Sequence, residues 1–207
     1  MSDTGPARND TARLQTFSDG VFAIAITLLA LEIDIPPASE RGGASLTLAL
    51  RELWPSFAAY AVSFLQIGVM WANHHNRFKV IRRSDHALIV LNTLLLMCVA
   101  FLPVATGVLA DHVRGSSGDV RAATVLYTGT LAASAAVFTA LWLWASRNKR
   151  LVDEAVDAAA LRTMDRRYVA GLLLYLAAMA LSPFWPSVAL TLVTALALRF
   201  LFPEPAV

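Results

Sequence analysis

The amino-acid sequence predicts an all-α, polytopic membrane protein with six transmembrane helices. Hydrophobic residues make up 57% of the 207 residues and charged residues only 15%, whereas about a quarter of the residues of a soluble domain are charged. The apolar residues form runs of membrane length that charged patches separate, which is typical of a polytopic membrane protein. The Lys and Arg residues lie between these runs and form no basic aromatic stripe, so no nucleic-acid partner is expected.

The chain is expected to form one domain with two short polar ends. Residues 1–12 are polar and rich in small side chains, which predicts a flexible cytoplasmic N-terminus. Residues 13–203 contain all six apolar runs and are predicted to fold as a single six-helix transmembrane domain. Residues 204–207 are left as a C-terminal tail.

The first three transmembrane helices are expected at residues 14–33, 53–76 and 86–109. The first is closed by Pro36 and Pro37, because a proline cannot continue a helix. The second begins with a Trp-Pro pair, and the third contains a long apolar run. Each of these three segments is long enough to span a bilayer.

The remaining three are expected at residues 120–145, 167–182 and 186–202. The last two are short for a bilayer that needs about 20 residues per helix. A Ser-Pro pair ends the first of them and a short link joins the two, which predicts a packed helical hairpin with Trp185 at the membrane interface. Residues 147–167 carry apolar side chains at helical spacing and predict a surface amphipathic helix, an extension of the fourth helix, or a solvated linker helix.

The basic residues predict the orientation. Thirteen of the 17 Lys and Arg residues fall on one side of the six-helix arrangement. The other side receives Arg41, Arg51, Arg114 and Arg121. Because cytoplasmic loops are enriched in Lys and Arg, this asymmetry predicts a multi-pass protein of the cell membrane with both termini in the cytoplasm.

The first expected helix begins with polar groups at membrane depth. Arg13, Phe17, Ser18 and Asp19 occupy its first two turns. A charge at membrane depth costs a few kcal/mol unless it is paired or hydrated, so an intramembrane carboxylate indicates a functional site.

One face of the same helix forms a longitudinal stripe at about 100° per residue. Its members are Arg13, Phe17, Gly20, Ile24, Thr27, Leu28 and Leu31. Asp34 continues the stripe at its outer end, whereas Asp19, Phe22 and Ile26 lie on the opposite side. Periodicity alone favours packing of the stripe against other helices. If several copies surrounded an axis, its aliphatic rings would gate ions by dewetting, and the Thr27 hydroxyls would replace part of an ion's hydration shell.

The Arg-x-x-x-Phe-Ser-Asp order of residues 13–19, with the Trp-x-x-His-His order of residues 71–75, resembles the prokaryotic potassium channels of the transmembrane protein 175 type. The resemblance implies a homotetramer around four first helices, because the signature occurs once per chain. In that family, the residue five beyond the signature Asp forms the narrowest point of the pore. A Thr three residues later contributes to selectivity, and these positions are Ile24 and Thr27 here.

The resemblance implies a passive, potassium-selective cation channel whose hydrophobic gate is formed by Ile24, Leu28 and Leu31. Potassium ions would pass transiently near Thr27, and Asp34 would concentrate cations at the outer mouth. Expected partners are potassium, other monovalent cations and membrane lipids. No cofactor and no enzymatic activity are expected, because the sequence offers no nucleophile–base pair and no metal-ligand spacing.

The polar groups of the first helix are predicted to join the end of the second in a structural network. Its expected members are Arg13, Phe17, Ser18, Asp19, Trp71, His74 and His75. Asp19 is expected to accept hydrogen bonds from Arg13, Ser18 or a histidine. Trp71, Trp142 and Trp144 lie at span ends and are expected to anchor at the membrane interface, and Asn92 and Thr93 are expected to form interhelical hydrogen bonds.

The alternative function is a proton-coupled secondary transporter that uses Asp19 with His74 and His75, because histidine titrates near neutral pH. Against it, the expected helices show no mid-helix Pro or Gly pair that would break them, and the sequence shows no inverted repeat.

Overall fold

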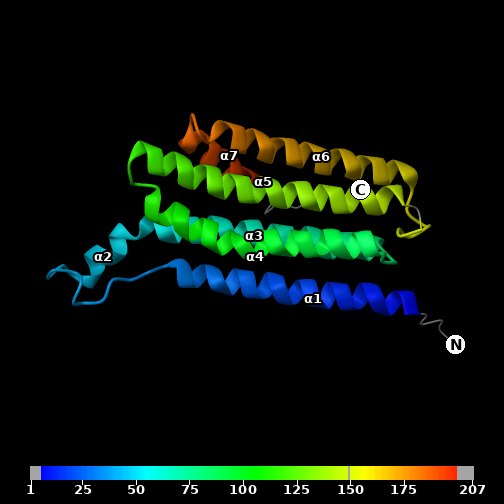
Figure 1. Ribbon diagram of the computed structural model, residues 1–207, viewed down its shortest axis with the longest axis horizontal. Coiled ribbons are helices and arrows are strands. Elements are labelled where there is room, and N and C mark those ends of the chain that lie inside the picture. Colours follow the sequence, from blue (N-terminus) through cyan, green and yellow to red (C-terminus); the bar gives the residue numbers. More distant parts are fainter. Residues whose placement is uncertain (1–5, 149, 200–207) are drawn as a thin grey trace.

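The computed structural model describes residues 6–148 and 150–199, which form an elongated helical bundle (Figure 1). The elements in chain order are α1 (Pro6–Leu28), the 3₁₀ helix η1 (Leu29–Glu32), α2 (Leu46–Glu52), α3 (Trp54–Val80), α4 (His86–His112), α5 (Ser117–Arg147), α6 (Ala158–Leu181) and α7 (Pro186–Arg199). The all-α fold class is confirmed for the described residues.

Four helical segments are long and apolar enough to cross a membrane. They are Thr11–Glu32, Trp54–Val80, His86–His112 and Ser117–Arg147. They match the first four expected helices. Most of their boundaries differ from the expected ones by a few residues. The last two expected helices appear as α6 and α7, which pack against each other as the predicted hairpin. Trp185, in the short link between them, is 60% exposed.

The first helix begins earlier than the sequence predicts. α1 starts at Pro6, so residues 6–12, which were expected to form a flexible N-terminus, are helical. A proline at the first helical position is favourable, because its missing N–H has no intrahelical partner there. Residues 1–5 and 204–207 lie outside the described residues.

A short helix, α2, lies in the connection between the first two long helices and was not predicted. Ser45 begins it: its Oγ accepts a hydrogen bond of 3.3 Å from the backbone N–H of Leu48. Such a cap satisfies one of the free N–H groups of a helix start. The apolar periodicity of seven residues is too short to distinguish a helix from a loop.

The helix expected over residues 147–167 forms only in its second half, as the start of α6. The chain leaves α5 at Arg147, turns, and enters α6 only at Ala158. The carbonyl oxygen of Leu151 accepts hydrogen bonds from the link between α3 and α4, and the N–H of Asp153 donates to the last residue of α3. Ile81 and Val152 form an isolated antiparallel bridge. Backbone groups engaged in this long-range pairing cannot form helical hydrogen bonds at the same time.

α4 runs through the middle of the bundle and packs against α1, α3 and α5. Its centre contains a single proline, Pro103, which does not break the helix. Helical residues continue on both sides of Pro103, which is buried. α1 lies on one flank and α6 on the other (Figure 1). The first helix is therefore an outer element that packs through one side, against α3 and α4.

Candidate functional site

The stripe predicted on the first helix is the exposed side of α1. Phe17 is 58% exposed, Ile24 60% and Leu31 77%, and Leu28 is exposed as well. Large apolar side chains of this kind on one contiguous face indicate a surface that contacts lipid or another protein. The described residues of the subunit therefore leave much of the stripe uncovered.

The opposite side of α1 is fully packed. Ser18, Phe22, Ala25 and Leu29 are at most 1% exposed. They follow the spacing of three and four residues that places side chains on one helical face. This buried face contributes to the common core with α3 and α4.

Thr27 is exposed in the middle of the stripe. Its Oγ1 donates a hydrogen bond of 2.8 Å to the carbonyl oxygen of Ile24 on its own helix. The hydroxyl proton is thus directed to the backbone. A hydroxyl oxygen has two acceptor lone pairs, so this oxygen keeps acceptor capacity for a cation.

The outer end of the stripe differs from the helical wheel. α1 gives way to η1 at Leu29, and the chain is extended at Ile33, with φ −94° and ψ 96°. Asp34 is exposed, but it lies beyond the end of the helix. Helical periodicity therefore does not predict the direction of its side chain, and the prediction made from it was wrong. Glu32 turns inward instead, and a Cβ at Gly107 of α4 would overlap its carboxylate. Gly107 therefore permits the close approach of η1 to α4.

A buried polar chain joins three helices beside the start of the stripe. His74 of α3 donates from Nε2 to Oδ1 of Asn92 of α4 over 2.8 Å. The Nδ2 of Asn92 donates to Oγ of Ser18 of α1 over 3.0 Å, and Ser18 donates to the carbonyl oxygen of Leu14. All three side chains are at most 1% exposed. We call Ser18, Asn92 and His74 the polar clasp.

The clasp confirms that Asn92 forms interhelical hydrogen bonds, whereas Thr93 bonds to the carbonyl oxygen of Ile89 on its own helix. His74 is also enclosed by aromatic rings. Its ring centroid lies 4.4 Å from that of Phe78 and 5.5 Å from that of Phe22. Apolar enclosure strengthens the hydrogen bonds inside and raises the cost of breaking them.

Asp19 is held by a residue that the sequence did not pair with it. Its Oδ1 accepts a hydrogen bond of 2.9 Å from Nε1 of Trp71. The expected donors were Arg13, Ser18 or a histidine, and this expectation was wrong. His75 stacks on Trp71 with ring centroids 5.8 Å apart. Trp71 therefore contacts both Asp19 and His75, whereas His74 bonds to Asn92.

Arg13 and Phe17 lie outside this network, on the exposed side of α1. The structure thus divides the predicted signature. Ser18 and Asp19 hold α1 against α3 and α4, whereas Arg13 and Phe17 belong to the stripe.

The tryptophans at the span ends have individual roles. Trp142 is fully buried and donates to Oδ1 of Asp165 over 2.7 Å, so its assignment to the membrane interface was wrong. Trp144 is exposed and donates to the carboxylate of Asp85. The length of the apolar run places both residues near an end of α5. It does not predict the side on which each one packs.

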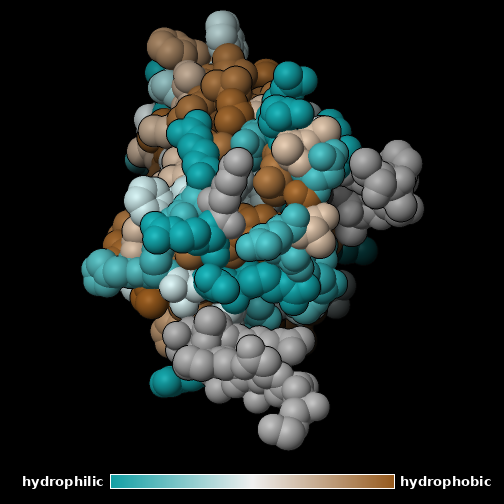
Figure 2. Space-filling model, turned by 90° about the vertical axis from the view of Figure 1, so that its right-hand side faces the viewer, coloured by the Kyte–Doolittle hydropathy of each residue, from teal (hydrophilic) through white to brown (hydrophobic). Residues whose placement is uncertain are grey.

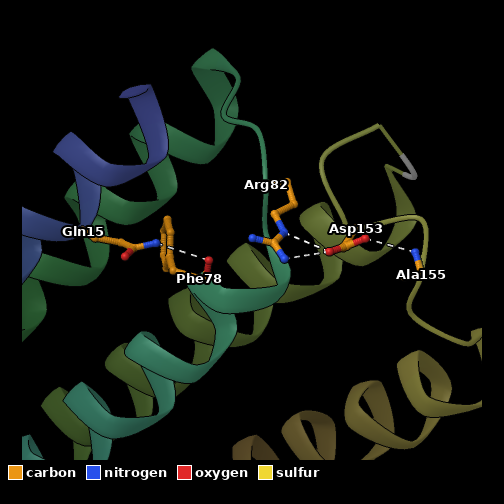
Figure 3. A network of polar contacts seen from close by, with 5 residues as sticks. All are labelled: Gln15, Phe78, Arg82, Asp153 and Ala155. Atoms are coloured by element: carbon orange, nitrogen blue, oxygen red, sulfur yellow. Dashed lines mark hydrogen bonds and ion pairs between the residues drawn. The ribbon is translucent and has the colours of Figure 1, made fainter. Parts of the chain in front are cut away.

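The start of α1 is tied to the end of α3 and its link to α4 by residues that sequence reasoning missed. Thr11 donates to the carbonyl oxygen of Arg82 over 3.0 Å. Gln15 donates to the carbonyl oxygen of Phe78 over 3.2 Å, as Figure 3 shows. Polar side chains at the start of an apolar run were the available signal. The hydrogen bonds of Thr11 and Gln15 fix α1 at the hydrophilic end of the bundle, which faces the viewer in Figure 2.

The same end carries an ion pair between Arg82 and Asp153, with 2.9 Å between Nη2 and Oδ2 (Figure 3). Two groups lower the pKa of Asp153: the backbone N–H of Ala155, which donates to the carboxylate, and then Arg82. The pair joins the α3–α4 link to the α5–α6 link. Because both side chains reach solvent, it fixes loop geometry more than it adds stability.

No group of three or more His, Cys, Asp or Glu side chains in residues 6–148 and 150–199 is arranged to hold a metal ion.

Comparison with known proteins identifies the family. Residues 13–103, which contain the stripe and the clasp, match the profile described as "Endosomal/lysosomal potassium channel TMEM175". A potassium channel of Streptomyces collinus is 48% identical over 81% of this chain and 80% of its own length. The chain belongs to the TMEM175 family.

The solved structures agree. The crystal structure of a lysosomal potassium-selective channel TMEM175 homolog from Chamaesiphon minutus superposes with a TM-score of 0.83 at 38% identity. The match covers 93% of this chain and 97% of that one. The human endosomal/lysosomal proton channel TMEM175 is 37% identical over 62% of this chain but only 28% of its own length. This TMEM175-family chain therefore shares the fold of an ion channel, and its matched relatives are channels rather than enzymes.

Proposed function

We propose that this TMEM175-family protein is a passive, potassium-selective cation channel formed by four copies of the chain around their α1 helices. One observation carries the proposal: α1 packs one face into its subunit and leaves a continuous apolar face uncovered. Potassium is proposed as the conducted ion because the bacterial relatives are named as potassium channels.

In the tetramer, the stripe lines the central pore. Ile24, Leu28 and Leu31 form successive apolar rings, and such constrictions stop ions by excluding water. Their exposure within the subunit leaves them free to meet the same residues of other copies. The hydrophobic gate thus needs no moving domain, only a change in ring diameter or hydration.

Thr27 supplies the hydroxyl of the stripe at membrane depth. Four Thr27 oxygens, with their protons directed to the backbone, offer a ring of acceptors that replaces part of an ion's hydration shell. Asp34 supplies carboxylates at the outer mouth, where they concentrate cations within the screening length of about 10 Å at 0.1 M salt.

The proposed topology has six transmembrane helices, with both termini in the cytoplasm. The start of α1, the α3–α4 link and the α5–α6 link share one end of the bundle (Figure 1). That end is hydrophilic (Figure 2) and carries most of the Lys and Arg residues, as expected of the cytoplasmic side.

The second candidate is a proton-linked function, which the name of the human relative favours. In this chain it would use Asp19 with His74 and His75. The geometry supports it less well, because Asp19 bonds to Trp71 and His74 bonds to Asn92.

Purified protein in liposomes with a potassium gradient and no proton gradient separates the two functions. A channel gives potassium currents that reverse at the potassium equilibrium potential, with single-channel steps. A coupled transporter needs the proton gradient, and its alternating access on microsecond-to-millisecond or longer timescales produces no such steps. Flux that appears only with a proton gradient would contradict the channel proposal.

A further inference from the structure

A second feature of the subunit lies away from the stripe. A cavity of about 310 Å³ opens between α3, α5, α6 and α7. Its walls are mainly apolar, with Phe138, Leu172 and Leu196 among them. Three arginines line it: Arg77 of α3, Arg167 of α6 and Arg199 of α7. No Asp or Glu lines it among the described residues.

Arg77 is the most buried of the three cations. Its guanidinium carbon lies 5.1 Å from the ring centroid of Trp142 and 5.5 Å from that of Tyr168. Its Nη1 donates to the sulfur of Met164 over 2.7 Å, and its Nε is buried with no hydrogen-bond partner. A thioether is a weak acceptor, whereas a guanidinium carries five N–H donors.

Arg77 thus lacks a strong acceptor. The ion pair of Arg82 with Asp153 does not involve Arg77, and neither of its members lines this cavity. A buried cation is costly unless an anion faces it. Phosphate satisfies this demand well, because its oxygens accept two parallel hydrogen bonds from one guanidinium.

The surroundings of the cavity indicate where such a phosphate comes from. Leu174 lines the cavity and is itself exposed, and Leu173 and Leu176 are exposed beside it on α6. A cavity of about 300 Å³ is at the lower end of small-molecule sites, so it accepts a headgroup while apolar chains stay outside. Basic pockets between transmembrane helices are suited to anionic lipid headgroups.

We infer that this cavity binds the phosphate headgroup of an anionic phospholipid, through Arg77, Arg167 and Arg199, while the acyl chains lie along the exposed leucines of α6. The inference depends on the membrane setting and not on ion conduction. Lipid binding here would join α3 to the α6–α7 hairpin, on the side of the subunit away from α1.

The test uses purified full-length protein in detergent, titrated with phosphatidylglycerol, phosphatidylcholine or inorganic phosphate. Retained lipid is measured by native mass spectrometry and the melting temperature by thermal unfolding. Phosphatidylglycerol is expected to be retained and to raise the melting temperature by several degrees, because a ligand that binds only the folded state stabilises it. Phosphatidylcholine and inorganic phosphate are expected to give no such shift.

Two variants and one control locate the site. Arg199→Gln, at an exposed position, and Arg77→Gln should each weaken phosphatidylglycerol binding about tenfold or more, as the loss of a charge-assisted hydrogen bond does. Arg166→Gln removes an exposed charge next to Arg167 without touching the cavity and should bind as the parent does. If Arg77→Gln fails to fold, Arg199→Gln decides the result.

Three outcomes would overturn the inference. Equal effects of phosphatidylcholine and phosphatidylglycerol would show that charge is not recognised. A full shift with inorganic phosphate alone would show a site for a soluble anion. Parent-like titration of Arg199→Gln, or equal weakening by Arg166→Gln, would show diffuse attraction to the basic end of the bundle.

Discussion

The two faces of α1 have opposite relations to the rest of the chain. The inner face carries Ser18, Phe22 and Leu29, and every one of these side chains is buried against α3 and α4. The outer face carries Ile24 and Leu31, which are equally apolar and yet exposed. Burial of apolar surface is the main favourable term in folding. An exposed apolar face is therefore unfavourable in water unless lipid or another protein covers it. The comparison teaches that one helix can serve two assemblies: its inner face packs the subunit, and its outer face is the one proposed to line the pore.

The largest expected effect is on the inner face. Asn92→Ala leaves the Nε2–H of His74 and the Oγ of Ser18 without their partner in the clasp. Each unsatisfied buried group costs about 1–3 kcal/mol, so the variant should lose about 2–5 kcal/mol of stability. Thermal unfolding of the purified protein measures this loss.

Thr93→Ala is the matched control, because the neighbouring Thr93 is exposed and bonds only to its own helix. It should stay within about 0.5 kcal/mol of the parent. Equal melting temperatures for Asn92→Ala and Thr93→Ala would show that the clasp does not hold α1.

The next effect is on the outer face. Ile24→Asn should wet the narrowest ring and raise basal potassium conductance at least about tenfold, which corresponds to a barrier lower by about 1.4 kcal/mol. Ile24→Leu keeps an apolar ring and should keep the low basal current. Liposome conductance at fixed potential compares the two, and an unchanged leak in a well-assembled Ile24→Asn protein would remove Ile24 from the gate.

Asp19 lies between the two faces and tests which of them it serves. Asp19→Asn keeps an acceptor for Trp71 but loses the charge, so stability should fall by about 1 kcal/mol, and Asp19→Ala should lose more. Adding Trp71→Phe to each variant gives a double-mutant cycle that isolates the coupling. A stable Asp19→Asn protein that loses proton-linked flux would instead favour the transporter.

The smallest effect is expected at Thr27. Thr27→Val keeps the shape and removes the hydroxyl, so the preference for potassium over sodium should fall severalfold without loss of assembly. Reversal potentials under bi-ionic conditions measure the ratio. Thr93→Val is the control, because Thr93 is exposed, bonds to its own helix and lies on α4 rather than on α1. Parent-like selectivity of Thr27→Val would leave the aliphatic rings to account for it.

Helical periodicity was sufficient to predict the stripe, because the angular positions of Ile24, Thr27 and Leu28 depend only on the regular turn of α1. It failed at Asp34, where the helix tightens and then ends. The turn of the chain after Glu32 depends on how η1 approaches α4 at Gly107, which is a contact far apart in sequence.

The polar residues in and around the clasp were easier to predict than their pairing. Ser18, Asp19 and His74 stood out as polar groups in apolar runs, yet their partners are Asn92 and Trp71. Pairing depends on the axial shift and rotation of packed helices, which one-dimensional patterns do not contain. The bridge of Ile81 with Val152 is likewise a contact between residues far apart in sequence. It lies in the first half of the helix expected over residues 147–167, which does not form.

The central claim is that the outer face of α1 lines an aqueous pore, and cysteine reactivity during current recording tests it most directly. Cys98→Ser first removes the single native cysteine. Ile24→Cys then places a thiol on the exposed stripe, and Ile26→Cys places one on the packed side two residues away. A thiol-reactive cation should block the current of Ile24→Cys and leave that of Ile26→Cys unchanged. A conducting Ile24→Cys channel that the reagent does not affect would contradict the account.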